Sequence, residues 1–389
     1  MMKVYLDNAA TTRVRQEAID AMLPCYTEFY GNPSGIHAFS REAARLVYES
    51  RDRVAAAINA NSNEIIFTAG GSESDNMALR GAAAMNAKKG KHIITTKVEH
   101  HAILHTLEAM EKEGLAEVTY LDVDEYGLVS ASQVEAALRP DTVLVSVMFA
   151  NNEVGTIMPI AEIGAVCRKQ GVLFHTDAVQ AVGHVPIDVT AMNIDLLSMS
   201  AHKLHGPKGI GALYVRKRGF IRPLVYGGGQ EKQLRAGTEN VPGMVGFGVA
   251  IEHAVKDMPM ITERMRAQRD RLIAGIQASI PEVKLNGHPE KRLPGNVNFS
   301  IKYIEGESIL LMLDLAGIAA SSGSACTSGS LDPSHVLLAM GLNHETAHGS
   351  LRMTLSEYTT DVEIEYVLKT LPGIVQKLRD MSPLYHGGK

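Results

Sequence analysis

The sequence predicts an α/β fold, with a large domain built on a mainly parallel sheet and a smaller α+β domain. Between residues 64 and 215, short apolar runs alternate with amphipathic stretches, as expected of parallel strands joined by crossover helices. Towards the C-terminus this alternation stops. The length of 389 residues fits two or three domains of about 150 residues each. We therefore expect a large domain over residues 15–258 and a small domain formed by residues 1–14 and 259–389.

The apolar runs define the strands expected in the large sheet. They occupy residues 65–67, 92–94, 118–121, 142–149, 172–174 and 196–199. Helical patterns separate several of them, at residues 76–88, 101–112 and 160–170. Parallel α/β sheets bind ligands beyond the carboxyl ends of their strands. The residues that follow each run are therefore the first place to look for a functional site.

The small domain is predicted from the last third of the chain. A long charged helix is expected at residues 260–278, a strand at 297–301, and helices at 307–315 and 361–380, with a Ser/Gly-rich loop before the last helix. The first dozen residues and a helix near residues 16–22 are expected to pack with this domain or to cover the large one.

Composition argues against several classes of partner. The chain is 45% hydrophobic and 21% charged, which is ordinary for a globular protein. A net charge of −5 and a pI near 6.3 give no electrostatic reason to expect nucleic acid or an anionic membrane surface. No segment approaches the roughly 20 apolar residues of a membrane span, and the first residues do not resemble a secretory signal. We expect neither nucleic acid nor membrane as a partner.

The cysteines indicate a reducing compartment. There are three, Cys25, Cys167 and Cys326, so they cannot all pair internally, and the cytoplasm is the default location. Cys25 and Cys167 are expected to be small buried hydrophobic residues. Cys326 instead stands in a run of Ser, Gly and Thr, which predicts an accessible loop and a thiol that is reactive by access.

Polar clusters follow five of the predicted strands. They occupy residues 68–73, 99–101, 151–153, 175–180 and 200–203. One such cluster would be ordinary loop chemistry. Because parallel strands end at the same edge of a sheet, five clusters are expected to face one crevice, as a cofactor site requires.

Gly70-Gly71-Ser72 opens a helical segment. Small residues let backbone N–H groups approach an anion, and the helix dipole favours a phosphate there. A pair of glycines alone is usually just a turn, and the motif is neither a Walker nor a Rossmann fingerprint. Gly246 and Gly248 form half of a Rossmann pattern within an apolar helical stretch, where packing is the better interpretation.

Asp177 and Lys203 indicate the chemistry of the crevice. Asp177 ends an apolar strand, and a buried carboxylate needs a cation, which a protonated pyridine nitrogen would supply. A helix N-cap is the alternative, and it would be favoured for Asp177 alone. Lys203 follows a buried strand among small and apolar residues, where burial suits a lysine to Schiff-base chemistry. Ser200 and His202 are candidate phosphate donors, whereas Lys208 is expected at the surface.

His100, His101 and His105 could form a metal cluster, since the last two have helical i, i+4 spacing. No Cys or acidic residue stands at metal-ligand spacing from them, so we predict no metal site. His100 fits better as an imidazole stacked on a cofactor ring, or as an acid or base.

Taken together, these clusters resemble the cysteine desulfurases of the class V aminotransferase family. The resemblance covers nearly the whole chain, from Tyr-Leu-Asp-Asn-Ala-Ala-Thr-Thr at 5–12 and Gly-Asn-Pro-Ser at 31–34 to Ser-Pro-Leu at 382–384. It implies a fold-type I transferase that depends on pyridoxal 5'-phosphate, with a mainly parallel seven-stranded sheet. It also implies an enzyme that removes sulfur from L-cysteine.

The resemblance assigns roles to individual residues. Lys203 looks like the lysine that forms a Schiff base with the cofactor, Asp177 would pair with the pyridine nitrogen, Gln180 with the ring oxygen, and His100 would stack on the ring. The phosphate would be held by Gly71, Ser72, Ser200 and His202. Thr238 would reach the phosphate in the other subunit, which implies a homodimer. Asn152, also near the cofactor, and Arg352 would hold the substrate carboxylate, with Asn32 as a further candidate.

The Cys326 segment is similar to that of the long-loop group of this family. The group's signature here is Ser-Ser-Gly-Ser-Ala-Cys-Thr-Ser followed by Leu-Asp-Pro-Ser-His-Val-Leu. Long-loop enzymes pass a persulfide to an iron–sulfur scaffold or to a thiolation partner. Gly349, Glu357 and the few residues after Pro383 depart from the best-known members, which leaves the identity of the acceptor open.

The expected mechanism starts with Lys203, whose amine removes the α-proton of cysteine while the cofactor ring paired to Asp177 accepts negative charge. Cys326, with its proton taken by a neighbour such as His100, then attacks the substrate sulfur and leaves alanine. A selenocysteine lyase or another class V transaminase is one alternative. The other is a non-catalytic sulfur- or iron-binding platform, in which Cys326 is a transient iron–sulfur ligand.

Overall fold

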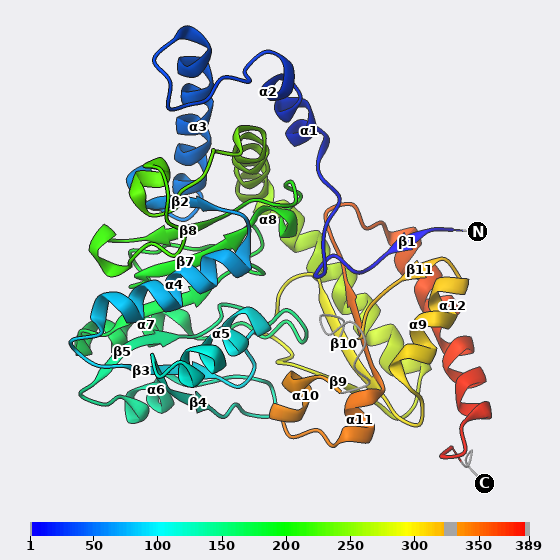
Figure 1. Ribbon diagram of the computed structural model, residues 1–389. Coiled ribbons are helices and arrows are strands. Elements are labelled where there is room, and N and C mark those ends of the chain that lie inside the picture. The colour runs from blue at the N-terminus through cyan, green and yellow to red at the C-terminus, as the bar shows by residue number, and fades with distance from the viewer. Residues whose placement is uncertain (1, 323–332, 386–389) are drawn as a thin grey trace.

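The computed structural model describes residues 2–322 and 333–385. It has a large part built on a seven-stranded sheet and a small part built on a three-stranded sheet (Figure 1). Helix α8 (Val241–Ser279) runs along both parts. Within the described residues, no helix has both the length and the apolar character needed to cross a membrane.

The large sheet has the strand order β2-β8-β7-β6-β5-β3-β4. Its strands are β2 (Ile65–Thr68), β3 (His92–Thr96), β4 (Glu117–Leu121), β5 (Thr142–Ser146), β6 (Leu173–Asp177), β7 (Leu196–Ser200) and β8 (Gly211–Val215). Strands β3 to β7 pair in parallel, whereas β8 is antiparallel to both of its neighbours. The mainly parallel seven-stranded sheet is therefore confirmed, although β8 has no counterpart among the predicted runs.

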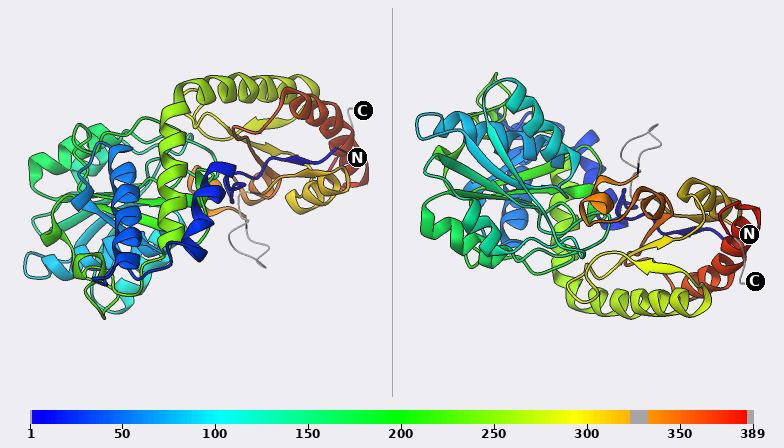
Figure 2. Two further views of the ribbon diagram at one scale, coloured as in Figure 1. Left: turned by 90° about the horizontal axis from the view of Figure 1, so that it is seen from above. Right: turned by 90° about the horizontal axis from the view of Figure 1, so that it is seen from below.

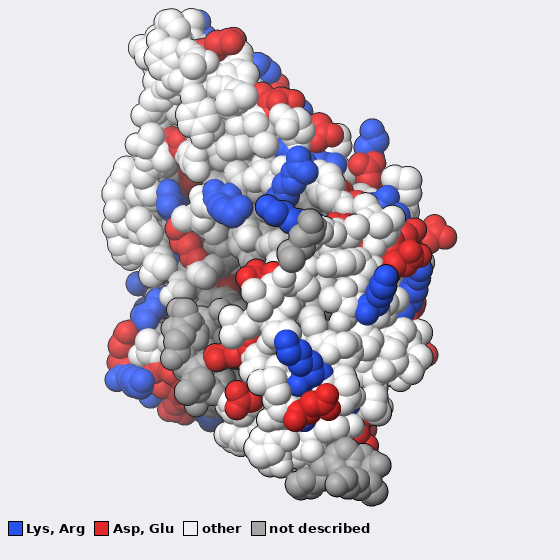
Figure 3. Space-filling view, turned by 90° about the vertical axis from the view of Figure 1, so that its right-hand side faces the viewer, with Lys and Arg blue, Asp and Glu red and all other residues white. Residues whose placement is uncertain are grey.

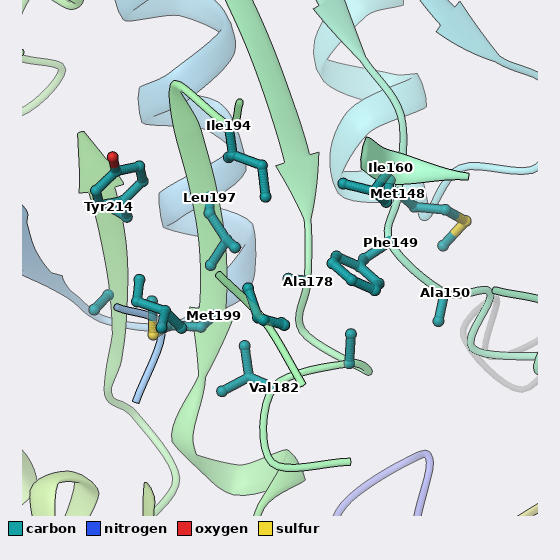
Figure 4. Packing of buried hydrophobic residues seen from close by; sticks show 14 of the residues in the cluster. Met148, Phe149, Ala150, Ile160, Ala178, Val182, Ile194, Leu197, Met199 and Tyr214 are labelled. Carbon is teal, nitrogen blue, oxygen red and sulfur yellow. The ribbon is translucent and has the colours of Figure 1, made fainter. Parts of the chain in front are cut away.

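Both faces of this sheet are covered by helices. Along β2, Ile65 and Phe67 join one apolar cluster and Ile66 joins another, because successive side chains of a strand point to opposite faces. Helices α4 (Gly71–Asn86) and α5 (His101–Lys112) contribute to the cluster of Ile66. The opposite cluster is filled from α3 (Ala38–Ala56), α6 (Ala131–Ala137), α7 (Ile160–Gln170) and the first half of α8, and part of it is drawn in Figure 4.

The predicted helices are present, with differences at some ends. Helices α1 (Gln16–Met22), α5 and α7 have the expected bounds. Helix α4 begins at Gly71, where the glycine pair was expected to open a helix, and five residues before the helical pattern expected at 76–88. Helix α8 contains the predicted 260–278 segment but starts at Val241, because Pro259 lies inside it without ending it. The helix bends sharply between the two parts of the molecule (Figure 2), as a proline within a helix allows.

The small part combines an antiparallel sheet with helices. Its strands are ordered β12 (Ser350–Thr354), β10 (Asn296–Ile301) and β9 (Val283–Leu285). Helices α9 (Gly306–Leu315), α12 (Asp361–Met381) and the second half of α8 bury its apolar face. A two-stranded parallel sheet joins β1 (Val4–Tyr5) to β11 (Ile318–Ala319), which places the N-terminus against this part.

Packing crosses the boundary drawn from the sequence. Helices α10 (His335–Ala339) and α11 (His344–His348) follow the small sheet's helix α9 in the chain. However, Val336 and Leu337 are buried in the core cluster of the large sheet. The division at residue 258 stays a prediction, and the chain on the C-terminal side of Cys326 is held by the large part.

Two features relate to the expected partners and compartment: the distribution of charge on the surface and the state of the cysteines. Cys25 and Cys167 are both free and buried, as predicted. On the face shown in Figure 3, Lys and Arg lie among Asp and Glu, without a broad area of one sign. Cys326 lies outside the described residues.

Candidate active site

A cavity of about 280 Å³ lies at the carboxyl ends of the large-sheet strands, beside β12 of the small part. All five polar clusters contribute to it. The predicted site residues that line it are Gly71, Ser72, His100, Asn152, Asp177, Gln180, Ser200, His202, Lys203 and Arg352. Strand topology thus brings together residues that are up to 281 positions apart in the sequence.

Lys203 reaches the cavity from the short turn after β7. The turn spans Ala201–Lys203, and it places the lysine directly beyond a strand whose residues are all buried. The Nζ atom donates to the carbonyl oxygens of Ala9 and Ala10, the latter at 2.7 Å. The N-terminal segment therefore covers the amine and holds it at one end of the cavity.

Asp177 ends β6 and is 6% exposed. Its Oδ1 accepts from the backbone N–H of Val179 at 2.9 Å, but the residues that follow form turns rather than the α-helix that an N-cap would begin. Burial raises the pKa of Asp177 to about 6, against the lowering effects of that hydrogen bond and of Lys203. A cation in the cavity would favour the ionised carboxylate.

Two further buried carboxyls lie near Asp177, and neither was given a role from the sequence, although Glu99 belongs to one of the polar clusters. Asp75 lies on α4 and lines the cavity, and burial and the charge of Asp177 raise its pKa well above the usual range. Burial raises the pKa of Glu99 to about 8. The available signals were helical spacing, which puts Asp75 on the same side of α4 as Gly71, and the position of Glu99 next to His100.

His100 is the N-cap residue of α5 and lines the cavity. Its Nδ1 accepts from the backbone N–H of Ala102 at 3.1 Å, so the proton of the neutral ring is on Nε2. Burial, assisted by the charge of Lys203, lowers the pKa of His100 to about 4. This geometry favours a neutral ring that stacks or donates from Nε2, more than one that takes up a proton.

The N-terminus of α4 forms a cradle for an anion. A second hollow, more open than the first, is lined there by Gly70, Ser72, Ser200 and His202 among others. A Cβ atom at Gly71 would lie 2.7 Å from Val179, so only glycine lets this turn lie so close to its neighbour. Backbone N–H groups, the helix dipole and two hydroxyls together suit a phosphate.

Arg352, on β12, is 2% exposed and reaches across to the large part. Its Nη1 donates to the carbonyl oxygen of Asn152 at 3.2 Å, and its Nη2 donates to Asp7 Oδ1 at 3.0 Å. Its Nε is buried and has no hydrogen-bond partner among the described residues. A buried guanidinium donor without a partner is costly, and a substrate carboxylate in the cavity would satisfy it.

Two predicted site residues do not line this cavity. Asn32 and Thr238 are both exposed, and the side-chain oxygen of Asn32 accepts from the backbone N–H of Ser34 at 2.9 Å. Both roles stay predictions, as does that of Cys326.

The residues present fit pyridoxal 5'-phosphate. The site combines a lysine amine, a buried carboxylate that requires a cation, and a helix N-terminus suited to a phosphate, all around one cavity. These are the groups needed for a Schiff base, a pyridinium nitrogen and a phosphate monoester.

The fold and the site define a pyridoxal-phosphate enzyme of fold type I, and comparison with known proteins specifies the family. Residues 4–367 match the family model described as aminotransferase class-V. The chain therefore belongs to the class V aminotransferase family, and within it to the cysteine desulfurases.

Individual relatives support this assignment over nearly the whole length. The chain is 58% identical over 385 residues to a Clostridium botulinum protein named cysteine desulfurase IscS, covering 98% of this chain and 97% of that protein. A solved structure named NifS-like protein superimposes with a TM-score of 0.91 at 38% identity, covering 97% of this chain and 100% of that one. A structure described as SspA in complex with cysteine has a TM-score of 0.82 at 37% identity, covering 92% and 100%.

Proposed function

We propose that this chain removes sulfur from L-cysteine, leaving L-alanine and a persulfide on Cys326. The observation that carries the proposal is the cavity itself, in which Lys203 and Asp177 face a carboxylate-binding arginine, Arg352, whose Nε lacks a partner among the described residues. The names of the relatives and the cysteine-bound solved structure support the same substrate.

Binding and proton transfer are assigned to residues of the cavity. When bound there, pyridoxal phosphate supplies an electron sink for negative charge from the substrate α-carbon. Arg352 and Asn152 hold the substrate carboxylate, which fixes the α-carbon close to Lys203. The Lys203 amine then takes the α-proton as a general base. Asp177, as a carboxylate, stabilises a positive charge on the pyridine nitrogen.

The sulfur step is assigned to Cys326. Its thiolate attacks the sulfur of the substrate, so an S–S bond forms while the C–S bond breaks, and the carbon product is protonated to give alanine. No external oxidant is needed, because the two-electron oxidation of sulfur in forming the S–S bond is balanced by the two-electron reduction of the substrate β-carbon, whose C–S bond is replaced by a C–H bond. A thiol with an ordinary pKa near 8.5 is partly ionised at neutral pH.

A homodimer is the second part of the proposal. Large apolar side chains lie exposed on the projecting segment that includes α2 (Pro24–Thr27) and α3, at the top of Figure 1. They are Leu23, Tyr26, Tyr30, Ile36, Phe39 and Tyr48. Exposed apolar area of this kind marks an association surface. Thr238 and Asn32, exposed in one chain, would then reach the site of the partner subunit.

The acceptor of the persulfide is proposed to be an iron–sulfur scaffold protein, because the relative at 58% identity carries the name IscS. A cytoplasmic location is proposed from the two free, buried cysteines.

The proposal is tested by cofactor colour and sulfide release. Purified protein is expected to be yellow and to release sulfide from cysteine when dithiothreitol is present. Cys326→Ala should stay yellow and lose sulfide release, whereas Lys203→Ala should lose both. A wild-type protein that stays colourless after reconstitution would overturn the proposal. Faster turnover of selenocysteine than of cysteine would favour a selenocysteine lyase.

A further inference from the structure

Two hydrogen bonds attach the chain on the C-terminal side of Cys326 to the loops around the cavity. Ser334 precedes α10 and caps it, accepting from the backbone N–H of Leu337 at 3.2 Å. The same hydroxyl donates to the carboxylate oxygen Oε2 of Glu153. The next residue, His335, donates from Nε2 to the carbonyl oxygen of Glu99 at 2.9 Å. These two residues form an anchor, which we call the Ser334–His335 anchor.

The Ser334 side of the anchor ends at a buried junction. Ser334 is 3% exposed and Glu153 is 4% exposed. The carbonyl oxygen of Glu153 accepts from the side-chain amides of Asn296 and Asn298, each at 3.0 Å. A large-sheet loop, a small-sheet strand and α10 therefore meet at Glu153. The residue before it, Asn152, lines the cavity.

The His335 side of the anchor ends at a second wall of the cavity. Glu99 immediately precedes His100, which lines the cavity. The ring of His335 also packs against His101, with ring centroids 4.6 Å apart. Val336, the following residue, is 1% exposed within the large core. The anchor is thus continuous with the buried core of the large part.

The chain on the N-terminal side of Cys326 is also attached at the cavity. Ser321 and Arg352 exchange two backbone hydrogen bonds, of 3.0 and 2.6 Å. Cys326 stands five residues after Ser321 and eight before Ser334. A five-residue segment spans at most about 18 Å, so the chain length alone limits how far Cys326 can lie from Ser321.

We propose that Ser334 and His335 are positioning residues for sulfur transfer, which hold the chain beyond Cys326 against the loops that carry Asn152 and His100. The inference rests on the proposed function, because it assumes that Cys326 accepts the sulfur. Neither residue lines the substrate cavity. Loss of the anchor should therefore leave cysteine binding intact. It should slow the attack of Cys326 on the substrate sulfur, because that step depends on the position of the thiol. Misplacing a reacting group by about 1 Å can cost roughly 100-fold in rate.

The test uses the holoenzyme without reductant, mixed with one equivalent of cysteine. Two readouts are followed: the cofactor absorbance change on cysteine binding, and persulfide on Cys326 by mass spectrometry. Ser334→Ala and His335→Phe remove the two donors, whereas Ser334→Thr and His335→Gln retain a donor. Asn343→Ala is the matched control, because Asn343 likewise caps a short helix, α11, by accepting from the Thr346 N–H at 2.8 Å, and this hydrogen bond stays within the helix.

Ser334→Ala and His335→Phe are expected to slow persulfide formation about tenfold, with the absorbance change kept within about twofold. The donor-retaining variants should recover most of the rate, and Asn343→Ala should match the wild type. The inference is overturned if the donor-deleted variants match the wild type, or if both readouts fall together. A wild type that forms alanine but no persulfide on Cys326 instead contradicts the proposed function. In that case the anchor is tested by the rate at which Cys326 is alkylated. Ser334→Ala should change this rate and Asn343→Ala should not, and an unchanged rate in Ser334→Ala would overturn the inference.

Discussion

At the residue scale, the environment of the cavity separates carboxyl groups that have similar pKa values in water. Asp177, Asp75 and Glu99 are all buried, and burial raises the pKa of each. With a pKa of about 8, Glu99 is largely protonated at neutral pH. With a pKa of about 6, Asp177 ionises first of these two, and it is the group that can pair with a pyridinium nitrogen. Local desolvation therefore assigns different protonation states to neighbouring groups.

The pKa of Glu99 predicts a pH dependence of stability. Because this pKa is raised from 4.5 to about 8, the folded chain holds the proton more tightly than the unfolded chain does. The associated stability is complete below about pH 4.5 and is lost as the pH rises through about 8. Glu99→Gln should remove this decline, which amounts to about 1.4 kcal/mol per pKa unit. Urea unfolding at a series of pH values measures it, and parallel curves for wild type and variant would refute the assignment.

Arg352→Lys should weaken cysteine binding while preserving the positive charge. Lysine lacks the planar fork, so it cannot keep the contacts to Asp7 and Asn152 and also present a donor to the substrate. Loss of a charged hydrogen bond of about 1.5–3 kcal/mol corresponds to a rise of roughly 10- to 100-fold in KM. Steady-state sulfide release checks this, with the exposed Arg45→Lys as the control. An unchanged KM for Arg352→Lys would show that the carboxylate binds elsewhere.

At the element scale, the N-terminus of α4 links the glycine pair to phosphate binding. The helix is 16 residues long and begins at Gly71, so its dipole and its first N–H groups are directed at the hollow lined by Ser72 and Ser200. The close approach of Gly71 to Val179 fixes where that helix can start. The helix start thus provides the phosphate site with positive potential, and the side chain of Lys208, which also lines the hollow, adds a cationic charge.

Gly71→Ala is therefore expected to lower cofactor affinity at least tenfold. The added Cβ would lie 2.7 Å from Val179 Cγ2, which is closer than an ordinary van der Waals contact. The start of helix α4 must therefore move. Cofactor titration followed by absorbance measures the effect. The matched control is Gly373→Ala in α12, where nothing lies within 4 Å of an added Cβ and the helix should gain about 0.5–1 kcal/mol. Equal cofactor affinity in both variants would contradict the role of Gly71.

The elements that were well predicted have ends marked in the sequence. Helix α7 ends where Gly171 adopts a φ of +66°, and α5 begins at a capping imidazole, His100. The apolar pattern of α4 starts five residues after the helix itself, because the polar first turn interrupts the apolar period. Strand β8 was not predicted. It begins with Gly211 and directly follows a segment rich in glycine, so the sequence does not show where the loop ends and the strand begins.

Much of the site could be predicted because each polar cluster directly follows an apolar run, and parallel strands end at one edge. Contacts between residues that are distant in the sequence could not be predicted. Asp7 meets Arg352 from 345 positions away, and Ser334 meets Glu153 across 181 positions. Such pairs depend on how the small part docks, and neither residue type carries a local signal of it.

At the scale of the whole molecule, the projecting apolar segment predicts the oligomeric state. Ile36, in the loop before α3, is 93% exposed, and it adds to the exposed apolar area of this segment. Ile36→Asp should shift the protein from dimer towards monomer in sedimentation velocity, because a charge would be buried without a partner. Met381→Asp, on α12 and 73% exposed, is the control and should leave the mass unchanged. A wild type that sediments as a monomer would contradict the prediction.

In the proposed function, one site made from both parts of the molecule transfers sulfur from cysteine to Cys326. The most direct measurement mixes holoenzyme with one equivalent of cysteine, carrying a sulfur label, in the absence of reductant. About one alanine per active site is expected, with the labelled sulfur bound to the peptide that contains Cys326. Alanine formed with no label on that peptide, or label on Cys326 in a Lys203→Ala variant, would contradict it.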